Sequence, residues 1–360
     1  TVQVWLDHLP DAGIRFREEP LNDEGMPVEF PAKLCLWLHH RFQHFGAGRA
    51  RGCIVLPLEL IEDNGAALRD AILQYAQHWG LSAAFQQWVV EENTFCDTLV
   101  DRIVSGYPTD RAAAITAATG QEDPLLVAGE YYHSWVISGP ESVAHELPFA
   151  QTDLNVTFTN DLKAYREIKV RILNGAHTSI VPTGYLAGID TVGEVMADET
   201  MASFLATVLY DEIIPSLDYP EEELKAFAAD VLDRFRNPTI KHRLLDIALN
   251  STSKFRTRLL PSLLSYQEKQ GQLPQGIVRA LAALIRFYRG DRNGQPIQLR
   301  DEPARIEFFQ KQWAAYTAGS QTLEQLVRNL LDQQEWWGQD LNEVPDLPSQ
   351  LTASLQTYLA

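Results

Sequence analysis

Three polar residues within a short stretch, Lys169, Asn174 and His177, have types and spacings suited to acid–base chemistry. On a helix that turns by about 100° per residue, Asn174 lies roughly 140° from Lys169, and His177 falls between them at roughly 80°. The three side chains can therefore point out of one face. A lysine, an amide and an imidazole supply a proton donor or acceptor and two hydrogen-bonding groups for a polar oxygen, which suits the interconversion of a carbonyl and an alcohol. A metal site would use carboxylates or thiolates instead, so no metal is expected.

Spacing alone leaves a structural alternative open, because any long amphipathic helix can carry Lys, Asn and His on its polar side. A resemblance favours the chemical interpretation. The pattern Lys169-x4-Asn174-x2-His177, inside the string KVRILNGAHT, is similar to the signature helix of the mannitol dehydrogenase family of polyol-specific long-chain dehydrogenases. The variant NGAHT resembles in particular the branch of that family that acts on hexuronates, the tagaturonate reductases.

The composition fits a globular protein of two domains. The chain has 360 residues, of which 45% are hydrophobic and 22% charged, and a chain of this length can bury substantial cores. Its net charge of −18 argues against nucleic-acid and anionic-membrane partners, because both attract basic surfaces. No run reaches the ~18 apolar residues of a membrane span, and no signal-like segment opens the chain. We expect a cytoplasmic protein that acts on a small molecule.

The cysteines and histidines do not predict a disulfide framework or a metal centre. The three cysteines are odd in number and widely spaced, which favours reduced thiols. Three histidines within residues 31–45 lack a carboxylate pattern such as H-E-x-x-H, which favours a solvated helix surface.

The first part of the chain has the pattern of an α/β nucleotide-binding domain. Residues 53–60, CIVLPLEL, form a nearly continuous apolar run, which is typical of a strand buried on both faces. Helical patterns cover 31–45, 66–79 and 82–91, and strand patterns cover 125–139, as a pair, and 156–159. We expect a partial Rossmann-like domain over residues 1–157.

The glycine-rich turn that opens a Rossmann domain does not occur in this sequence. A G-x-G-x-x-G turn cradles the pyrophosphate with backbone amides, and the 360 residues contain no such string. The family resemblance implies an N-T-T-E-A-G-like strand end beside the cofactor, and residues 9–13, LPDAG, keep only the end of it. We expect the domain to lack roughly its first half.

Two acidic residues follow strand-like runs in this domain. Glu59 lies at the end of CIVLPLEL, and the carboxyl ends of parallel strands face the ligand crevice. The resemblance implies that Glu59 replaces an asparagine that holds the reacting oxygen in mannitol dehydrogenases. Asp101, in the run V-D-R-I, forms either a structural ion pair with Arg102 or the edge of the site. Because the family places its acid there, we expect Asp101 and Glu59 to contact the cofactor, and Glu59 also the substrate.

Residues 158–360 predict a mostly α-helical second domain. Asn160 or Asp161 can cap the helix that carries Lys169 by accepting from its free amides. Further helical patterns, separated by Pro and Gly, cover 200–213, 221–235, 241–250, 275–288, 305–316, 322–333 and 347–358.

Two predicted loops of this domain gather basic residues in an otherwise acidic chain. They are 234–238, RFRNP, and 253–258, SKFRTR. These charges either balance the surface or bind an anion, because guanidinium and ammonium groups match a carboxylate. Ser-Lys-Phe resembles the substrate-contacting S-K-F of the family, which implies a substrate role for Lys254, with Arg256 as a weaker addition.

The resemblance implies an NAD-dependent oxidoreductase that interconverts tagaturonate and altronate. In the implied mechanism Lys169 exchanges the proton of the reacting oxygen, which calls for a pKa well below the free value of about 10.4. Asn174 orients that oxygen, and His177 binds a neighbouring hydroxyl. Lys254 meets the sugar chain or its carboxylate.

Three alternatives stay open from the sequence. Another member of the family, fructuronate reductase or a mannitol dehydrogenase, differs only in specificity. A non-catalytic fragment would fold without holding NAD, because the glycine-rich turn is absent. A helical scaffold would explain the second half alone, but not the joint occurrence of CIVLPLEL, V-D-R-I and the Lys-Asn-His helix. The sequence does not separate NAD from NADP, and it does not predict an oligomeric state.

Overall fold

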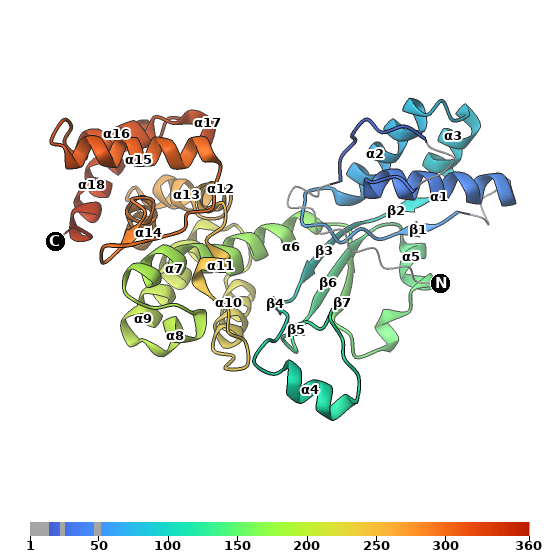
Figure 1. Cartoon of the computed structure of the whole chain (residues 1–360), viewed down its shortest axis with the longest axis horizontal. Coiled ribbons are helices and arrows are strands. Elements are labelled where there is room, and N and C mark those ends of the chain that lie inside the picture. Colours follow the sequence, from blue (N-terminus) through green and yellow to red (C-terminus); the bar gives the residue numbers. More distant parts are fainter. Residues whose placement is uncertain (1–13, 22–25, 47–51, 360) are drawn as a thin grey trace. The chain divides into compact units, whose positions relative to one another are not determined.

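The computed structural model describes residues 14–21, 26–46 and 52–359 (Figure 1). The string at 9–13 lies outside these residues. Packing divides the chain into two units, which are described separately. One comprises Thr1–Ile103 with Tyr131–Arg166, and the other comprises Val104–Glu130 with Glu167–Ala360. The predicted division into domains 1–157 and 158–360 stays a prediction.

The first unit is built on short strands. β3 (Asp97–Asp101), β6 (Ser134–Ser138) and β7 (Val156–Thr159) form a sheet with β6 in the middle. β6 runs antiparallel to β3 and parallel to β7. β1 (Ile54–Val55) pairs in parallel with β2 (Thr94–Phe95), which ends one residue before β3 begins. The segment that leaves β1 therefore starts beside the junction of β2 and β3.

Helices α1 (Phe30–Phe45), α2 (Asn64–His78) and α3 (Ala83–Glu92) pack together in this unit. Their shared core is largely aromatic. Phe85 and Trp88 are buried, and the Phe42 ring lies 5.6 Å from each of them, between ring centroids. Such tilted and edge-to-face contacts add to the stabilisation from burial. A further helix, α5 (Glu141–Glu146), follows β6.

Two predicted strands in this part differ from the structure. The run 53–60 pairs only at Ile54–Val55, because Pro57 has no N–H to donate to a sheet. The pair predicted within 125–139 exists as β5 (Ala128–Gly129) and β6, but these strands do not pair with each other. β5 pairs with β4 (Val104–Gly106), and β6 lies in the three-stranded sheet.

The second unit is mostly helical. Its signature helix consists of α6 (Leu162–Lys169), a π-helical segment (Val170–Asn174) and α7 (Gly175–Leu186). The Asp161 carboxylate caps α6 by accepting from the Ala164 N–H at 3.2 Å. The other helices are α4 (Ala112–Thr119), α8 (Val192–Ala197), α9 (Glu199–Thr207), α10 (Glu221–Phe235), α11 (Leu244–Ile247), α12 (Ser251–Arg258), α13 (Leu260–Gln270), α14 (Gln275–Phe287), α15 (Pro303–Thr317), α16 (Leu323–Leu331), α17 (Gln334–Trp337) and α18 (Leu347–Thr357).

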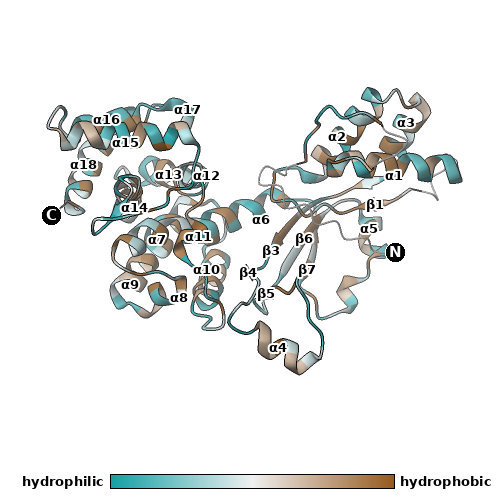
Figure 2. Cartoon of the chain, in the orientation of Figure 1, coloured by the Kyte–Doolittle hydropathy of each residue, from teal (hydrophilic) through white to brown (hydrophobic). Residues whose placement is uncertain are grey.

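Helix α14 lies in the core of the second unit. Every residue of it except Gln275 and Arg279 is buried, and it packs against α7 and α18. Burial on nearly all sides is typical of an interior helix. In α10 only one face is buried, and Figure 2 shows hydrophobic and hydrophilic residues side by side along it. Because α14 packs against α7, and α7 is itself buried from Gly175 to Tyr185, the helix that carries His177 lies in the core of this unit.

The helix predictions for the second unit are confirmed at α10, α14 and α18 and are wrong at two places. Residues 241–250 contain only the short α11, and the predicted loop 253–258 is helical, in α12. Arg243 is extended and forms a β-bridge with Thr191, so α11 begins only at Leu244. Asn250 takes a left-handed conformation, with φ at 52°, immediately before α12 begins. None of the helices in the described ranges combines the length and apolarity needed to cross a membrane.

Candidate active site

A π-helical segment separates Lys169 from Asn174. The Gly175 N–H donates to the Val170 carbonyl, five residues back instead of the four of an α-helix. One inserted residue places each later residue where its predecessor would lie in an unbroken helix. Asn174 then lies roughly 40° from Lys169, and His177 roughly 20° to the other side. The three residues therefore share a narrower face than their spacing in an unbroken α-helix gives.

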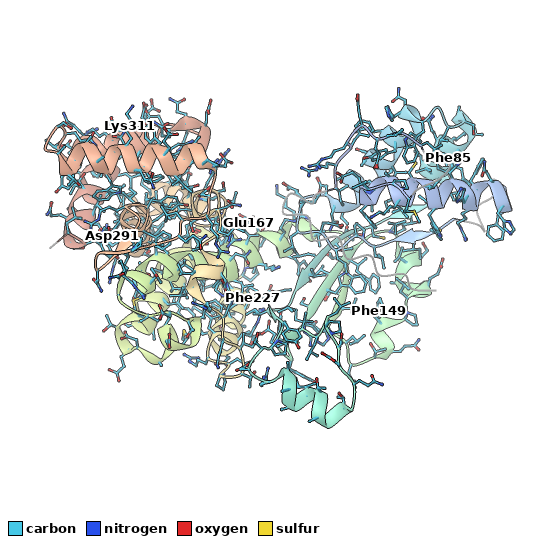
Figure 3. The ribbon with its side chains drawn as sticks, viewed as in Figure 1. Phe85, Phe149, Glu167, Phe227, Asp291 and Lys311 are labelled. Atoms are coloured by element: carbon cyan, nitrogen blue, oxygen red, sulfur yellow. The ribbon has the colours of Figure 1, made fainter. Side chains whose placement is uncertain are left out.

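The side chain of Arg171 fixes this segment. Its Nε donates to Ser262 Oγ at 2.7 Å, and its terminal nitrogens donate to Ser216 Oγ at 3.1 Å and to Glu167 Oε1 at 3.3 Å. The Glu167 carboxylate, labelled in Figure 3, also accepts from the Tyr219 hydroxyl at 2.8 Å. Each nitrogen of the buried guanidinium has a partner, so the π-helical segment is tied to α13 and to Ser216.

His177 is 7% exposed and lies between two rings. It stacks on Phe235 with ring centroids 4.2 Å apart, and it meets His242 edge-on at 5.1 Å. Burial lowers the pKa of His177 well below 6.5. Neighbouring charges lower it further, in the order His242, Arg258, Arg234 and Lys254. The imidazole is therefore neutral near pH 7.

Both imidazoles hold a nitrogen that is available to a ligand. His177 Nε2 and His242 Nδ1 are buried and have no hydrogen-bond partner among the described residues. Burial also lowers the pKa of His242. Buried polar atoms are rarely left without partners, and such an atom marks a candidate ligand contact. No local motif surrounds His242 in the sequence, so its position beside His177 was not predicted.

One of the cations near His177 is neutralised inside the protein. Arg234 donates to both oxygens of the Glu130 carboxylate at 2.8–3.2 Å, and the two side chains are 6% and 2% exposed. A bidentate contact of this kind satisfies a buried guanidinium. The other charges that His177 senses include those of Lys254 and Arg258, which form no ion pair among the described residues.

The basic residues of α12 point in two directions. Lys254 and Arg258 are four residues apart and share one face, whereas Arg256 lies roughly 160° from either of them. Arg256 donates to the Glu335 carbonyl at 3.3 Å, on α17. The structure brings Lys254 into the surroundings of His177 and places Arg256 on the other side of α12.

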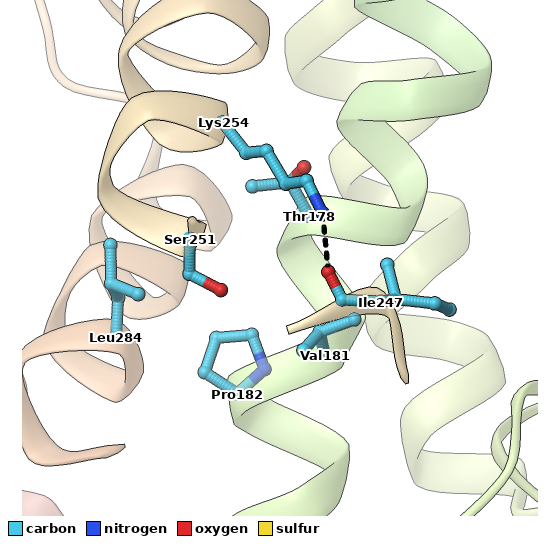
Figure 4. A pocket seen from close by; sticks show the side chains of 7 residues that line it. All are labelled: Thr178, Val181, Pro182, Ile247, Ser251, Lys254 and Leu284. Atoms are coloured by element: carbon cyan, nitrogen blue, oxygen red, sulfur yellow. Dashed lines mark hydrogen bonds between the residues drawn. The ribbon is translucent and has the colours of Figure 1, made fainter. Parts of the chain in front are cut away.

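Lys254 borders a small pocket beside α7 (Figure 4). Its Nζ donates to the Ile247 carbonyl at 2.7 Å, and burial lowers the pKa of Lys254 to about 8. The cavity, about 10 Å³, is close to the smallest that holds one water molecule. A six-carbon sugar acid does not fit in it. The lining consists of Thr178, Val181, Pro182, Ile247, Ser251, Lys254 and Leu284.

Arg258, which the sequence analysis did not select, contacts the signature helix directly. Its terminal nitrogen donates to Thr178 Oγ1 at 3.4 Å, and that hydroxyl donates to the Asn174 carbonyl at 2.8 Å. A Cβ at Gly175 would lie 3.3 Å from Ile213, which is tight, and 3.5 Å from the Arg258 carbonyl, which is an ordinary contact distance. Recognising 253–258 as a helix would have placed Arg258 on the face of Lys254.

In the first unit, Asn64 ties together the segments that carry Glu59 and Asp101. Its side-chain N–H groups donate to the carbonyls of Pro57, Glu59 and Thr98 at 3.0–3.2 Å, and its Oδ1 accepts from the Thr98 N–H at 2.8 Å. Asp101 ends β3 three residues later and is 8% exposed, whereas Glu59 is half-buried. The two predicted acids therefore belong to one edge of this unit.

The start of α2 does not offer amides to a phosphate. The Gly65 N–H donates to Asp97 Oδ1 at 2.8 Å, so this end of the helix already has an anion. Asp101 ends β3, whereas Glu59 lies four residues after the end of β1. The cofactor contacts predicted for Glu59 and Asp101 stay predictions.

Comparisons with known proteins cover nearly the whole chain. Residues 22–151 match the model of the mannitol dehydrogenase Rossmann domain, and residues 161–359 match that of the mannitol dehydrogenase C-terminal domain. The altronate oxidoreductase of Yersinia enterocolitica is 48% identical over 358 residues, which are 99% of this chain and 74% of that protein. The altronate oxidoreductase of Klebsiella pneumoniae is 47% identical over 355 residues, again 99% and 74%.

The fold resembles that of a solved dehydrogenase. The structure of Pseudomonas fluorescens mannitol 2-dehydrogenase, in a ternary complex with NAD and D-mannitol, matches with a TM-score of 0.68 at 21% identity. The match covers 92% of this chain and 64% of that one, so the chain spans less than two thirds of its length. The predicted fold class, a partial Rossmann-like domain followed by a mostly α-helical domain, is confirmed. With both domain models matched and relatives aligned over almost its whole length, the chain belongs to the mannitol dehydrogenase family.

Proposed function

We propose that this protein catalyses the NAD-dependent, reversible reduction of tagaturonate to altronate. The relatives called altronate oxidoreductases, 47–48% identical over nearly the whole chain, support this activity. The observation that carries the chemistry is the π-helical segment, which gathers Lys169, Asn174 and His177 on one narrow face. The uncompensated charges of Lys254 and Arg258 beside that face favour an anionic substrate over a neutral one.

In the proposed mechanism Lys169 gives its Nζ proton to the carbonyl oxygen of tagaturonate and takes it back from the alcohol of altronate. Asn174 donates from its amide to the same oxygen, which stabilises the negative charge that develops there. His177, neutral near pH 7, uses its vacant Nε2 to hold a neighbouring hydroxyl. Lys254 binds the anionic end of the substrate, and Arg256 is a weaker candidate for the same role.

The nicotinamide cofactor, when bound, supplies the hydride. The match to a Rossmann domain and the complex of the Pseudomonas enzyme with NAD support NAD as that cofactor. From this chain, Glu59 and Asp101 would accept hydrogen bonds from the ribose, with Asn64 holding the backbone of the Glu59 segment. Glu59 is also a candidate for contact with the substrate.

The experiment is to follow NADH oxidation with tagaturonate, fructuronate and fructose, using the full-length protein. We expect turnover with tagaturonate and much less with the other two. Fructuronate or fructose as the better substrate would replace this proposal with another activity of the family. If none of the three substrates is turned over, the proposed activity of this protein is wrong.

The proton role of Lys169 is tested by Lys169→Ala. We expect kcat to fall by about 10²- to 10⁴-fold, the usual contribution of a general acid or base, while NADH still binds. Arg328→Met is the control, because Arg328 is half-exposed and, within the described part of the chain, forms an ion pair with Glu324 on α16 alone. Retained kcat in Lys169→Ala would remove Lys169 from the mechanism.

A further inference from the structure

Arg258 is an arginine with little internal compensation. Among the residues that the structure describes, its side chain has one polar contact, the 3.4 Å hydrogen bond to Thr178 Oγ1, a neutral group. Within the part of the chain that the structure describes, no carboxylate forms an ion pair with it. Burial lowers its pKa to about 10, and no neighbouring charge offsets that effect. A cation withdrawn from water without a counter-ion is unfavourable in the absence of a ligand.

Arg258 is half-buried, and the fully buried arginines of this unit show what internal compensation looks like. Arg234 has the Glu130 carboxylate, and Arg286 has Asp291 at 3.3 Å. Arg305 has Glu302 at 3.1 Å, together with two hydroxyl groups on α12. Each of these arginines is paired with an acid of this chain. Arg258 departs from that pattern.

The surroundings of Arg258 place it next to the proposed chemistry. Thr178, which accepts from Arg258, follows His177 in α7 and donates to the carbonyl of Asn174. Lys254 lies one helical turn away on the same face of α12, and it too forms no ion pair among the described residues. Two cations thus stand side by side, close to residues that would hold hydroxyl and carbonyl oxygens.

We propose that Arg258 binds the carboxylate of the sugar-acid substrate, with Lys254 as the second cation of this subsite, and that the pair selects sugar acids over neutral polyols. The inference deepens the proposed function and rests on it for the identity of the substrate. A guanidinium presents two parallel N–H groups to a carboxylate, whereas a lysine acts as a single charge. Arg258 would therefore fix the orientation of the acid, and Lys254 would add attraction.

The test measures the binding of altronate and of altritol, which differ only in the carboxylate, to the full-length protein with NADH present, so that altronate is not oxidised during the measurement. Calorimetry gives both Kd values for the wild type, Arg258→Met and Arg258→Lys. We expect Arg258→Met to weaken altronate binding by about 10- to 100-fold, the range for a hydrogen-bonded charge, and to leave altritol binding nearly unchanged. Arg258→Lys should keep part of the preference for the acid.

Two further variants test whether the preference for altronate depends on the face of α12 that carries Arg258. Arg256→Met removes a cation from the opposite side of the same helix, so its effect on the preference for altronate should be much smaller. Arg328→Met controls for the change in net charge. A larger loss of preference in Arg256→Met than in Arg258→Met would overturn the assignment.

Other outcomes separate this inference from its alternatives. Equal losses for altronate and altritol in Arg258→Met, with a lower unfolding temperature, would make Arg258 a structural residue and overturn the proposal. Loss of NADH binding with altronate binding retained would assign Arg258 to a cofactor phosphate and overturn it as well. If the wild type binds altronate through Arg258 but does not reduce tagaturonate, the carboxylate subsite stands and the proposed activity fails.

Discussion

Arg171 lies within the signature helix, whereas Arg258 contacts that helix from α12, and their surroundings differ in kind. Arg171 is 7% exposed, and each nitrogen of its guanidinium has a partner: Ser262, Ser216 or Glu167. Arg258 contacts a single hydroxyl and no acid of the described chain. The interactions of Arg171 are complete within the fold, whereas Arg258 carries a charge that no acid of the described residues balances.

Whether a cation withdrawn from water has partners inside the protein indicates whether it stabilises the fold or binds a ligand. The cost of withdrawing a guanidinium from water is offset either by internal acids and hydroxyls or by a ligand. Internal partners predict a loss of stability on substitution. Missing partners predict a loss of ligand affinity with little loss of stability. Substitutions that break the internal contacts of Arg234 or Arg171 should therefore lower the free energy of unfolding.

The largest effect on stability is expected at the pair of Arg234 and Glu130. Glu130→Gln leaves the Arg234 guanidinium buried without its counter-ion, so the free energy of unfolding should fall by about 3–5 kcal/mol. Urea denaturation followed by circular dichroism measures it. A change below about 1 kcal/mol would mean that solvent or other groups already compensate Arg234, and the distinction from Arg258 would weaken.

A smaller loss is expected at Arg171. Arg171→Met leaves Ser216 and Ser262 without their donor, and the free energy of unfolding should fall by about 2–3 kcal/mol. Because the same contacts hold the π-helical segment, kcat should also fall, by up to about 100-fold, the scale of misplaced catalytic groups. The Kd of altronate should change little. If the variant loses affinity for altronate while keeping its stability, Arg171 has a role in binding, as proposed for Arg258.

The smallest effect concerns the pH dependence at Lys254. Burial, Arg258 and Arg300 lower the pKa of Lys254 to about 8, while Asp301 opposes them. Below pH 8 the ammonium is charged and attracts a carboxylate, and above pH 8 this attraction is lost. Altronate affinity should therefore fall by about tenfold between pH 7 and pH 9, in proportion to the charged fraction. Lys254→Met should lack this dependence, and a wild-type affinity that stays constant would contradict the role of Lys254.

Periodicity in the sequence predicted the elements whose burial follows a regular pattern. The range 221–235 coincides with α10, and 156–159 coincides with β7. Both have uniform repeats of apolar residues and end at Pro, Gly or polar residues. The run 53–60 was overestimated, because apolar composition does not reveal how many residues find a partner strand, and Pro57 limits that number.

The candidate site was predictable in its residue types but not in its geometry. Spacing and resemblance predicted Lys169, Asn174 and His177 as candidates, whereas no amino-acid composition distinguishes a π-helical segment from an α-helix. Arg258 was missed because SKFRTR has few apolar residues, which hides the helix that pairs it with Lys254. Arg171 and Asn64 act through contacts with residues far along the chain, and no local pattern encodes such contacts.

The π-helical segment also has a consequence for how this stretch tolerates changes in length. Deleting one residue between Lys169 and Asn174 would let the backbone return to regular α-helical hydrogen bonding, which is the commoner and more stable arrangement. The same deletion would leave Asn174 four residues after Lys169, roughly 40° away on a regular helix, which is the separation that the π-helical segment now gives. A shorter chain would thus gain a more regular helix and keep the alignment of its polar face, so this stretch should tolerate the loss of one residue better than a regular α-helix does.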